Sequence, residues 1–397
     1  MALTNLHTWI YPWDIARRGA RAIADELTAL GVNAASITTV YHSAQILSLI
    51  SGAPEIVFPS PGVPLWETQP SQLPGALNGL RWSNFLSEVS DVFRGNGIAL
   101  RAWTIAYHDK YDMKPVTNAF GQALPHAPCP LANARWLADA AQTIASFGVF
   151  DAFEVESPGF VPAFHGYHHD IIGIAIGSVE NLLLGLCFCE TCRSAMTDAN
   201  IDSAALEELV QRWWGRAALE GSLADEPFLN LANLLLAYPP LATWLARRAQ
   251  IIEDNVVNAA LQFPGKTAIV GPALSRPARN FLIEGGRFVP SAATDKLESV
   301  VLAYSSPRAV RDDVRDCFAL GWCAEDLVVG ITLVEGAVEG LNDVMMRVEA
   351  AWEAGARRFS FYNYGLLPKS RREWLGKVSE WMASKGDLQD GGVAGRD

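Results

Sequence analysis

The stretch Phe150-Asp-Ala-Phe-Glu-Val-Glu156, together with the segment in front of it, decides the fold. Apolar residues at helical spacing between Ala132 and Phe147 predict a helix, and Gly148 closes that helix just before the β-rich stretch begins. A helix that leads through a glycine turn into a short strand is one unit of an alternating α/β protein.

Alternation within this strand sorts its side chains onto two faces. A period of two residues places Glu154 and Glu156 on one face, with Phe153 and Val155 on the other. An apolar face suits a sheet that is covered by helices on its outside. The two glutamates are therefore expected to point into the interior of a closed sheet.

The same pattern recurs along the whole chain. Amphipathic segments separate most of eight β-rich runs, and strands that alternate with helices imply a parallel sheet, because a parallel connection needs a crossover. Eight such units predict an α/β fold, the (β/α)8 TIM barrel. An open, doubly wound sheet is the alternative, but the first strand is not followed by the glycine fingerprint of dinucleotide binding. The predicted strands are 6–11, 34–41, 99–107, 150–156, 267–270, 299–304, 327–333 and 358–363, and the predicted helices are 14–30, 82–93, 132–147, 241–261, 308–320, 341–354 and 371–383.

We expect one barrel domain over residues 1–384 with two long insertions. These are residues 42–96 after the second strand and 157–265 after the fourth, and the latter carries predicted helices at 203–219 and 226–237. Both follow the C-terminal end of a strand, where barrels build their active sites, so they are expected to shape a substrate cleft or a contact in a homo-oligomer. Residues 385–397 are polar and glycine-rich and are expected to form a disordered tail.

Composition narrows the class of protein. The 397 residues are 50% hydrophobic and 19% charged, which is typical of a globular chain, and the formal net charge of −12 argues against a nucleic-acid partner. No apolar stretch approaches the roughly 20 residues that cross a bilayer. The N-terminus lacks the basic start and apolar core of a signal peptide, so we expect a cytoplasmic protein without a membrane partner.

Carboxylates are expected at the carboxyl edge of the barrel. Glu156 ends the fourth strand, where it would meet substrate, and burial raises the pKa of such a group toward the range of a general acid. Glu154 lies one layer deeper, where it would orient substrate or take part in a buried ion pair. Glu335, after the seventh strand, is the candidate second carboxylate, with Asp109 in reserve.

Imidazole and aromatic groups gather at the same predicted edge. All seven histidines, His7 and His126 among them, are placed on strand 1 or in loops that follow strands, and tryptophans and tyrosines accompany them. Flat rings that stack on sugar C–H faces, mixed with amide, imidazole and carboxylate groups, favour a carbohydrate over a phosphate. The predicted substrate-binding residues are Trp9, Tyr11, His42, Trp103, His108, Glu154, His165, His168, His169, Tyr304, Tyr362 and Asn363.

Two clusters could hold a metal. The loop His165-Gly-Tyr-His-His-Asp170 could ligate a metal ion, donate hydrogen bonds to sugar hydroxyls or form a polar lid. Cys187-Phe-Cys-Glu-Thr-Cys192 offers three thiols within six residues, which suits tetrahedral zinc if Cys129 supplies the fourth ligand. Free buried thiols are the alternative. Cys317 and Cys323 are interpreted as packing residues.

Three of these motifs together resemble a known family group. The opening Trp9-Ile-Tyr-Pro-Trp-Asp14, the glutamate that ends strand 4 and the Cys-x-Cys-x-x-Cys stretch resemble glycoside-hydrolase (β/α)8 barrels, family 42 β-galactosidases in particular. The resemblance implies Glu156 as acid/base, Glu335 as nucleophile and a structural zinc on the cysteines 129, 187, 189 and 192. That family has asparagine before its acid/base, whereas this chain has Val155.

The sequence thus predicts a glycosidase that cleaves a glycosidic bond with carboxylates and needs no cofactor for catalysis. A non-catalytic carbohydrate-binding barrel is one alternative, motivated by Val155. A metal-dependent sugar isomerase or lyase that uses His165, His168 and His169 is another.

Overall fold

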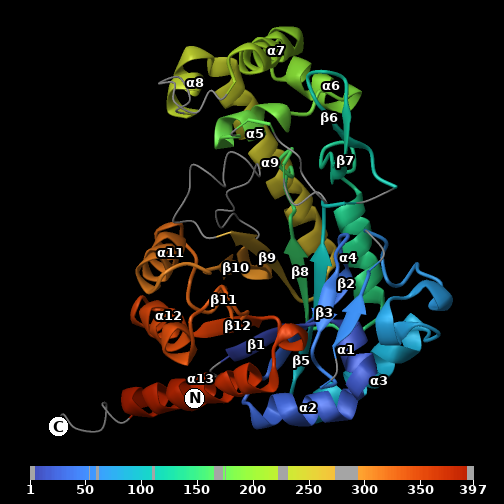
Figure 1. The fold of residues 1–397 in the computed structure, drawn as a ribbon, viewed down its shortest axis with the longest axis vertical. Coiled ribbons are helices and arrows are strands. Elements are labelled where there is room, and N and C mark those ends of the chain that lie inside the picture. Colours follow the sequence, from blue (N-terminus) through green and yellow to red (C-terminus); the bar gives the residue numbers. More distant parts are fainter. Residues whose placement is uncertain are drawn as a thin grey trace.

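The computed structural model describes residues 5–52, 54–59, 62–109, 112–164, 173–174, 176–221, 231–272 and 294–390. Eight parallel strands close into a barrel in the order β1-β2-β5-β8-β9-β10-β11-β12, and helices surround it (Figure 1). The predicted (β/α)8 barrel is confirmed. The strands are β1 (Asn5–Ile10), β2 (Ala34–Val40), β5 (Ala99–Ile105), β8 (Ala152–Glu156), β9 (Lys266–Pro272), β10 (Leu297–Leu302), β11 (Leu327–Thr332) and β12 (Arg358–Tyr362).

The outer helices follow the predicted order with one correction. The helix predicted over 14–30 is two helices, because Gly19 has φ 88° and both ends the first helix and begins the second. The first of them starts at Pro12, after Tyr11, so Asp14 lies inside the helix and is buried. The outer helices are α1 (Pro12–Arg18), α2 (Ala20–Ala29), α3 (Trp82–Gly95), α4 (Trp136–Ser146), α9 (Pro239–Gln262), α11 (Pro307–Ala319), α12 (Leu341–Glu353) and α13 (Lys369–Asp390).

Both expected insertions contain structure of their own. The first holds the hairpin β3 (Ile46–Ser48) and β4 (Glu55–Val57), followed by the short 3-10 turns η1 (Pro70–Gln72) and η2 (Gly75–Leu77). The second holds α5 (Ser178–Leu184), α6 (Glu190–Asp198), α7 (Ser203–Glu220) and α8 (Leu231–Ala237), and of its predicted helix at 226–237 the part before 231 lies outside the described residues.

The connection after β5 is also enlarged, which the sequence did not predict. It forms the hairpin β6 (Pro115–Thr117) and β7 (Ala123–Pro128), whose residues pack with α5, α6 and α7 in a second hydrophobic cluster. We call β6, β7 and α5 to α8 the cap; it lies at one end of the molecule, beyond the barrel (Figure 1).

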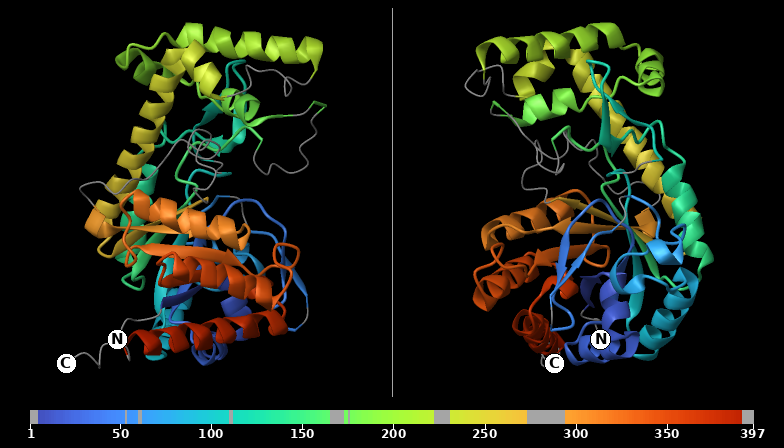
Figure 2. Two further views of the ribbon diagram at one scale, coloured as in Figure 1. Left: turned by 90° about the vertical axis from the view of Figure 1, so that its left-hand side faces the viewer. Right: turned by 45° about the vertical axis from the view of Figure 1, so that its right-hand side comes forward.

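The long helix α9 joins the cap to the barrel. It runs from the cap down to the barrel in both views of Figure 2, and it packs against α4. Its first turns contribute Leu241 and Trp244 to the cap cluster, whereas Val256 and Ala259 belong to the barrel core. A single helix therefore contributes side chains to both hydrophobic clusters.

At the end of the chain, α13 continues to Asp390, beyond the boundary at which the tail was expected to begin; the residues after it lie outside the described part. Within the described residues, no helix is both long and apolar enough to span a membrane.

Candidate active site

Glu156 ends β8 on the inner face of the barrel. Its Oε2 accepts a 2.6 Å hydrogen bond from the indole Nε1 of Trp103, a buried residue of the neighbouring strand β5. The next residue, Ser157, has φ 52°, so the backbone turns sharply directly after the carboxylate. Glu156 is thus held by a side chain at the edge of the barrel and is half-buried.

Three tyrosine hydroxyls meet next to this carboxylate. The hydroxyl of Tyr11 lies 2.9 Å from that of Tyr41 and 3.0 Å from that of Tyr362. Burial raises the pKa of Tyr41, Tyr362 and Tyr304, and the negative charge of Glu156 raises each of them further. These phenols therefore stay protonated at neutral pH and can donate hydrogen bonds at the mouth of the barrel.

The aromatic rings form a packed floor beneath the hydroxyls. Tyr11 stacks on Trp13 with centroids 4.6 Å apart and on Trp103 at 5.8 Å, and Trp9 lies 6.1 Å from Tyr362. Trp9, Tyr11 and Trp103 are at most 2% exposed. These rings are buried against one another in this structure, so they support the site from below rather than offer an open face to a sugar.

Glu154 belongs to a buried ion network and not to the rim. It accepts hydrogen bonds from Ser36 Oγ at 2.8 Å, from Trp9 Nε1 at 3.1 Å and from the Arg101 guanidinium. Arg101 also binds Glu298 at 2.8 Å, and Glu298 binds Arg358 at 2.8 Å. Glu154 was expected among the substrate-binding residues; instead its oxygens are engaged by these three donors inside the barrel, where it is 1% exposed.

Glu335 and Asp109, the two candidates for the second carboxylate, follow different strands of the barrel. The last residue of β11 is Thr332, and Glu335 lies beyond it as an exposed residue in a bridge to Val338. Asp109 follows β5 with φ 54°, and its Oδ2 accepts a 2.8 Å hydrogen bond from the backbone N–H of Ser43. That bond fixes the loop after β2 to the loop after β5.

Two of the histidines lie together at the rim. The His42 ring is 4.7 Å from the His108 ring and 4.4 Å from Tyr41, on which it stacks. Three others, His165, His168 and His169, lie outside the described residues.

Two histidines and one asparagine do not occupy the positions at the rim of the barrel that the sequence predicts for them. His7 pairs with Ala34, the first residue of β2, so it lies near the opposite end of the barrel, and burial lowers its pKa well below the usual value. His126 lies on β7 of the cap, with Nε2 3.4 Å from Pro162 O. Asn363 is fully buried, and its Oδ1 accepts a hydrogen bond from Gly365 N. Buried in this way, Asn363 stabilises the turn after β12.

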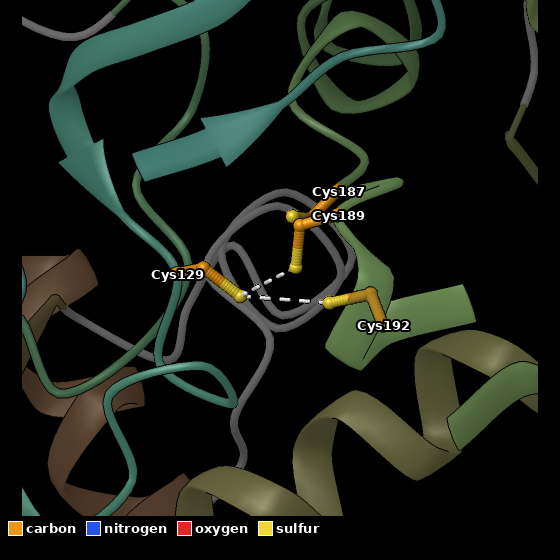
Figure 3. A group of neighbouring side chains, drawn as sticks. All are labelled: Cys129, Cys187, Cys189 and Cys192. Atoms are coloured by element: carbon orange, nitrogen blue, oxygen red, sulfur yellow. Dashed lines mark hydrogen bonds between the residues drawn. The ribbon is translucent and has the colours of Figure 1, made fainter. Parts of the chain in front are cut away.

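Four cysteines converge where the cap meets the loop after β7 (Figure 3). Cys129 follows β7, Cys187 and Cys189 precede α6, and Cys192 lies in its first turn. The Sγ of Cys129 is 3.5 Å from that of Cys192 and 3.9 Å from that of Cys189, and all four sulfurs lie within 4.8 Å of one another.

These separations fit one metal ion. Four sulfurs at about 2.3 Å from a tetrahedral zinc are about 3.8 Å from each other. Among the described residues, this is the one group of histidine, cysteine and acidic side chains that could hold a metal. Cys317 is buried, as expected of a packing residue, whereas Cys323 is exposed and donates to Asp326.

Sequence reasoning missed three residues that the structure brings to these sites. Arg101 shares the inward face of β5 with Trp103, and a charged residue in a barrel strand was an available signal. Tyr41 directly precedes His42 in the chain, so its place next to a predicted rim residue was an available signal. Arg248 is a buried cation on the mainly apolar inner face of α9, and only the structure shows what it faces.

No protein-family model and no curated protein sequence matches the chain. Solved structures share its fold. The glycoside hydrolase domain of PgaB (BpsB) from Bordetella bronchiseptica is 11% identical with a TM-score of 0.56, over 94% of this chain and 98% of that one. The catalytic domain of β-amylase from Paenibacillus polymyxa is 12% identical with a TM-score of 0.54, over 96% and 99%.

A third similar structure is the β-galactosidase from the psychrophilic Marinomonas ef1, at 10% identity and a TM-score of 0.52. The match covers 97% of this chain and 60% of that one. At such identities the likeness establishes the fold: this chain has the barrel seen in glycoside hydrolases, as the motif resemblance implied.

Proposed function

We propose that this chain is a glycoside hydrolase that uses Glu156 as its proton donor at the carboxyl edge of the barrel. The observation that carries the proposal is the environment of Glu156: an inward-facing carboxyl group at the end of β8, bound by Trp103 and close to the tyrosine hydroxyls. The fold shared with three carbohydrate-active enzymes supports a sugar as the substrate.

In this reaction the carboxyl proton of Glu156 passes to the glycosidic oxygen while the bond from that oxygen to the anomeric carbon breaks. In the same step a second carboxylate either attacks the anomeric carbon or activates the water that attacks it. In the first case a glycosyl-enzyme forms, and water activated by the Glu156 carboxylate then hydrolyses it and releases the sugar. We assign the role of the second carboxylate to Glu335, whose carboxylate is exposed next to Gly336; Asp109 is the alternative, although one of its oxygens already binds Ser43.

A barrel that binds carbohydrate without cleaving it is the second candidate function. It is favoured by the end of β11, where Thr332 and not a carboxylate occupies the last strand position. The two functions differ in one observable, since both bind sugar and only the first releases a reducing end.

The test compares Glu156→Gln with wild type on oligosaccharides and on aryl glycosides. General acid catalysis contributes about 10²–10⁴-fold, so E156Q should lose that factor on oligosaccharides. It should lose much less on aryl glycosides with acidic phenols, because such leaving groups depart without protonation. Loss of the second carboxylate, in E335Q or D109N, should impair both substrates.

Glu339→Gln is the matched control, since Glu339 is an exposed carboxylate on the same loop as Glu335. Equal activity of E156Q and wild type on oligosaccharides would reject Glu156 as the acid. Sugar binding by wild type without turnover of any glycoside tested would support the binding barrel instead.

We also propose that Cys129, Cys187, Cys189 and Cys192 hold a structural zinc ion. The sulfur separations and the all-thiol donor set support it. Four protein ligands leave no open position on a tetrahedral ion, so this zinc would stabilise the cap and take no part in hydrolysis.

A further inference from the structure

Arg248 is a buried cation at the joint between the cap and the barrel. It is 1% exposed and lies on α9 between Trp244, in the cap cluster, and Val256, in the barrel core. Its Nε and Nη1 have no hydrogen-bond partner among the described residues, and its guanidinium lies 4.0 Å above the ring of Phe160.

Such an arrangement requires a source of negative charge. Burial lowers the pKa of Arg248 to about 10, so the side chain is still charged at neutral pH. A buried charge without a partner is strongly unfavourable, and one aromatic face compensates only part of the loss of water. The ring of Phe160 therefore does not offset the full cost of burying this charge.

The cysteine cluster packs in the same part of the molecule. Cys129, Cys187 and Cys192 belong to the buried cluster that also contains Phe160 and the α9 residues Trp244 and Leu245, one helical turn before Arg248. The electrostatic effect of these cysteines raises the pKa of Arg248, against the larger effect of burial. Four neutral thiols would not balance a cation, whereas four thiolates around a divalent ion carry two net negative charges. The unpaired cation and the all-thiolate site complement each other.

We infer that Arg248 is the counter-charge of a tetrathiolate metal centre at Cys129, Cys187, Cys189 and Cys192. This inference rests on the zinc site proposed above and adds to it a residue outside the ligand set. It also explains why a guanidinium occupies the buried, mainly apolar face of a helix shared by two hydrophobic clusters.

The same helix connects the centre to the active-site loop. Phe160, beneath the guanidinium, closely follows Glu156 and Ser157 in the chain. Further along α9, Asn255 Nδ2 donates a 3.2 Å hydrogen bond to Pro130 O, next to Cys129. Metal binding would therefore hold α9, the cap and the chain that leaves Glu156 in one arrangement.

The test uses Arg248→Met, which keeps the length and removes the charge, and Arg248→Lys, which keeps the charge. Arg247→Met is the matched control, because Arg247 is the exposed neighbour on the same helix. Zinc affinity is measured by competition with a chromophoric chelator. We expect R248M to weaken zinc binding roughly 10- to 100-fold, as loss of a supporting residue around a metal does. R248K and R247M should stay within a few-fold of wild type.

Thermal unfolding with and without zinc separates this role from packing. Removing a buried, unbalanced cation should raise the melting temperature of the metal-free protein and lower that of the zinc-loaded protein. A residue that only fills space would lower both alike. Should R248M fail to fold, Arg248→Gln repeats the comparison with R248K.

Negative results for the zinc site and for the role of Arg248 can be told apart. If wild type takes up no zinc, the metal site itself is wrong. If wild type binds zinc and R248M binds it equally well, or if R248M destabilises both forms alike, the zinc site stands and the role of Arg248 is overturned.

Discussion

The indole nitrogen of Trp103 donates a 2.6 Å hydrogen bond to Oε2 of Glu156, and the two residues belong to neighbouring strands of the barrel. Trp103 is buried, and its ring packs against Tyr11 and Tyr41. A rigid aromatic donor thus fixes the orientation of the carboxylate without using a mobile side chain. The position of the proposed acid is therefore set by the packed ring floor below it.

Trp103→Phe should keep that floor and remove the donor. A hydrogen bond to a charged group contributes about 1.5–3 kcal/mol, so kcat should fall roughly 10- to 100-fold on oligosaccharides. The limb of the pH–rate profile that reports Glu156 should move to higher pH, because the charged carboxylate loses a donor. Steady-state kinetics across pH check both effects.

Trp82→Phe is the control, since Trp82 lies on α3 and its buried indole nitrogen has no hydrogen-bond partner among the described residues. An unchanged pH profile in W103F, with folding intact, would show that Trp103 does not position the acid.

Glu154→Gln should lower the stability of the fold and should affect the rate of hydrolysis less directly. Among the described residues, the change leaves Arg101 with Glu298 as its one acidic partner in the buried interior of the barrel. Breaking one side of a buried ion pair costs about 3–5 kcal/mol, so the free energy of unfolding in urea should fall by about that amount. E156Q should lose little stability by comparison. Equal stability of E154Q and wild type would contradict the role given to the network.

The sequence could predict the barrel and the direction of its glutamates, because both follow from local periodicity. Phe153 faces outward and packs on Phe263 of the α9 end, while Glu154 faces inward, as the period of two requires. It could not predict the partners of Glu154. Arg101 on β5 and Glu298 on β10 belong to strands that do not pair, and the closure of the barrel brings their side chains together in its interior.

The helix break at Gly19, the ligand Cys129 and the depth of His7 differ in how far local sequence predicts them. The break at Gly19 was visible as a glycine within a helical pattern, but whether a helix bends or ends there depends on tertiary packing. Cys129 could be assigned to the other cysteines because the topology places its loop on the same edge as theirs. The buried histidine His7 was misplaced because strand 1 gives no signal of how deep each residue lies.

Cys129→Ser should abolish stoichiometric zinc binding. One zinc per chain is expected in wild type, because the cluster offers one set of four ligands. Exposed Cys323 provides the matched control, and C323S should retain the metal. Elemental analysis after gel filtration, with the melting temperature before and after chelation, checks the prediction. Full zinc content in C129S, or none in wild type, would refute this ligand set.

Asp14→Asn should change how stability depends on pH. Asp14 is 1% exposed and accepts a 2.6 Å hydrogen bond from Ser48 Oγ, which attaches the β3–β4 hairpin to α1. Burial raises the pKa of Asp14 from 3.8 to about 7, against the opposing effect of the Ser48 hydrogen bond. Below about pH 4 the carboxyl is protonated in both the folded and the unfolded chain, and its stabilising contribution is complete.

As pH rises from about 4 through about 7, the unfolded chain loses this proton first, and the stabilising contribution disappears. A pKa of 3.8 raised to about 7 corresponds to on the order of 4 kcal/mol. D14N should therefore gain stability relative to wild type as pH increases, with the largest difference near pH 8. Urea unfolding at pH 4, 6 and 8 measures it, with Asp25→Asn as the exposed control on α2. Parallel curves for D14N and wild type would mean that Asp14 is ionised in the folded protein throughout this range.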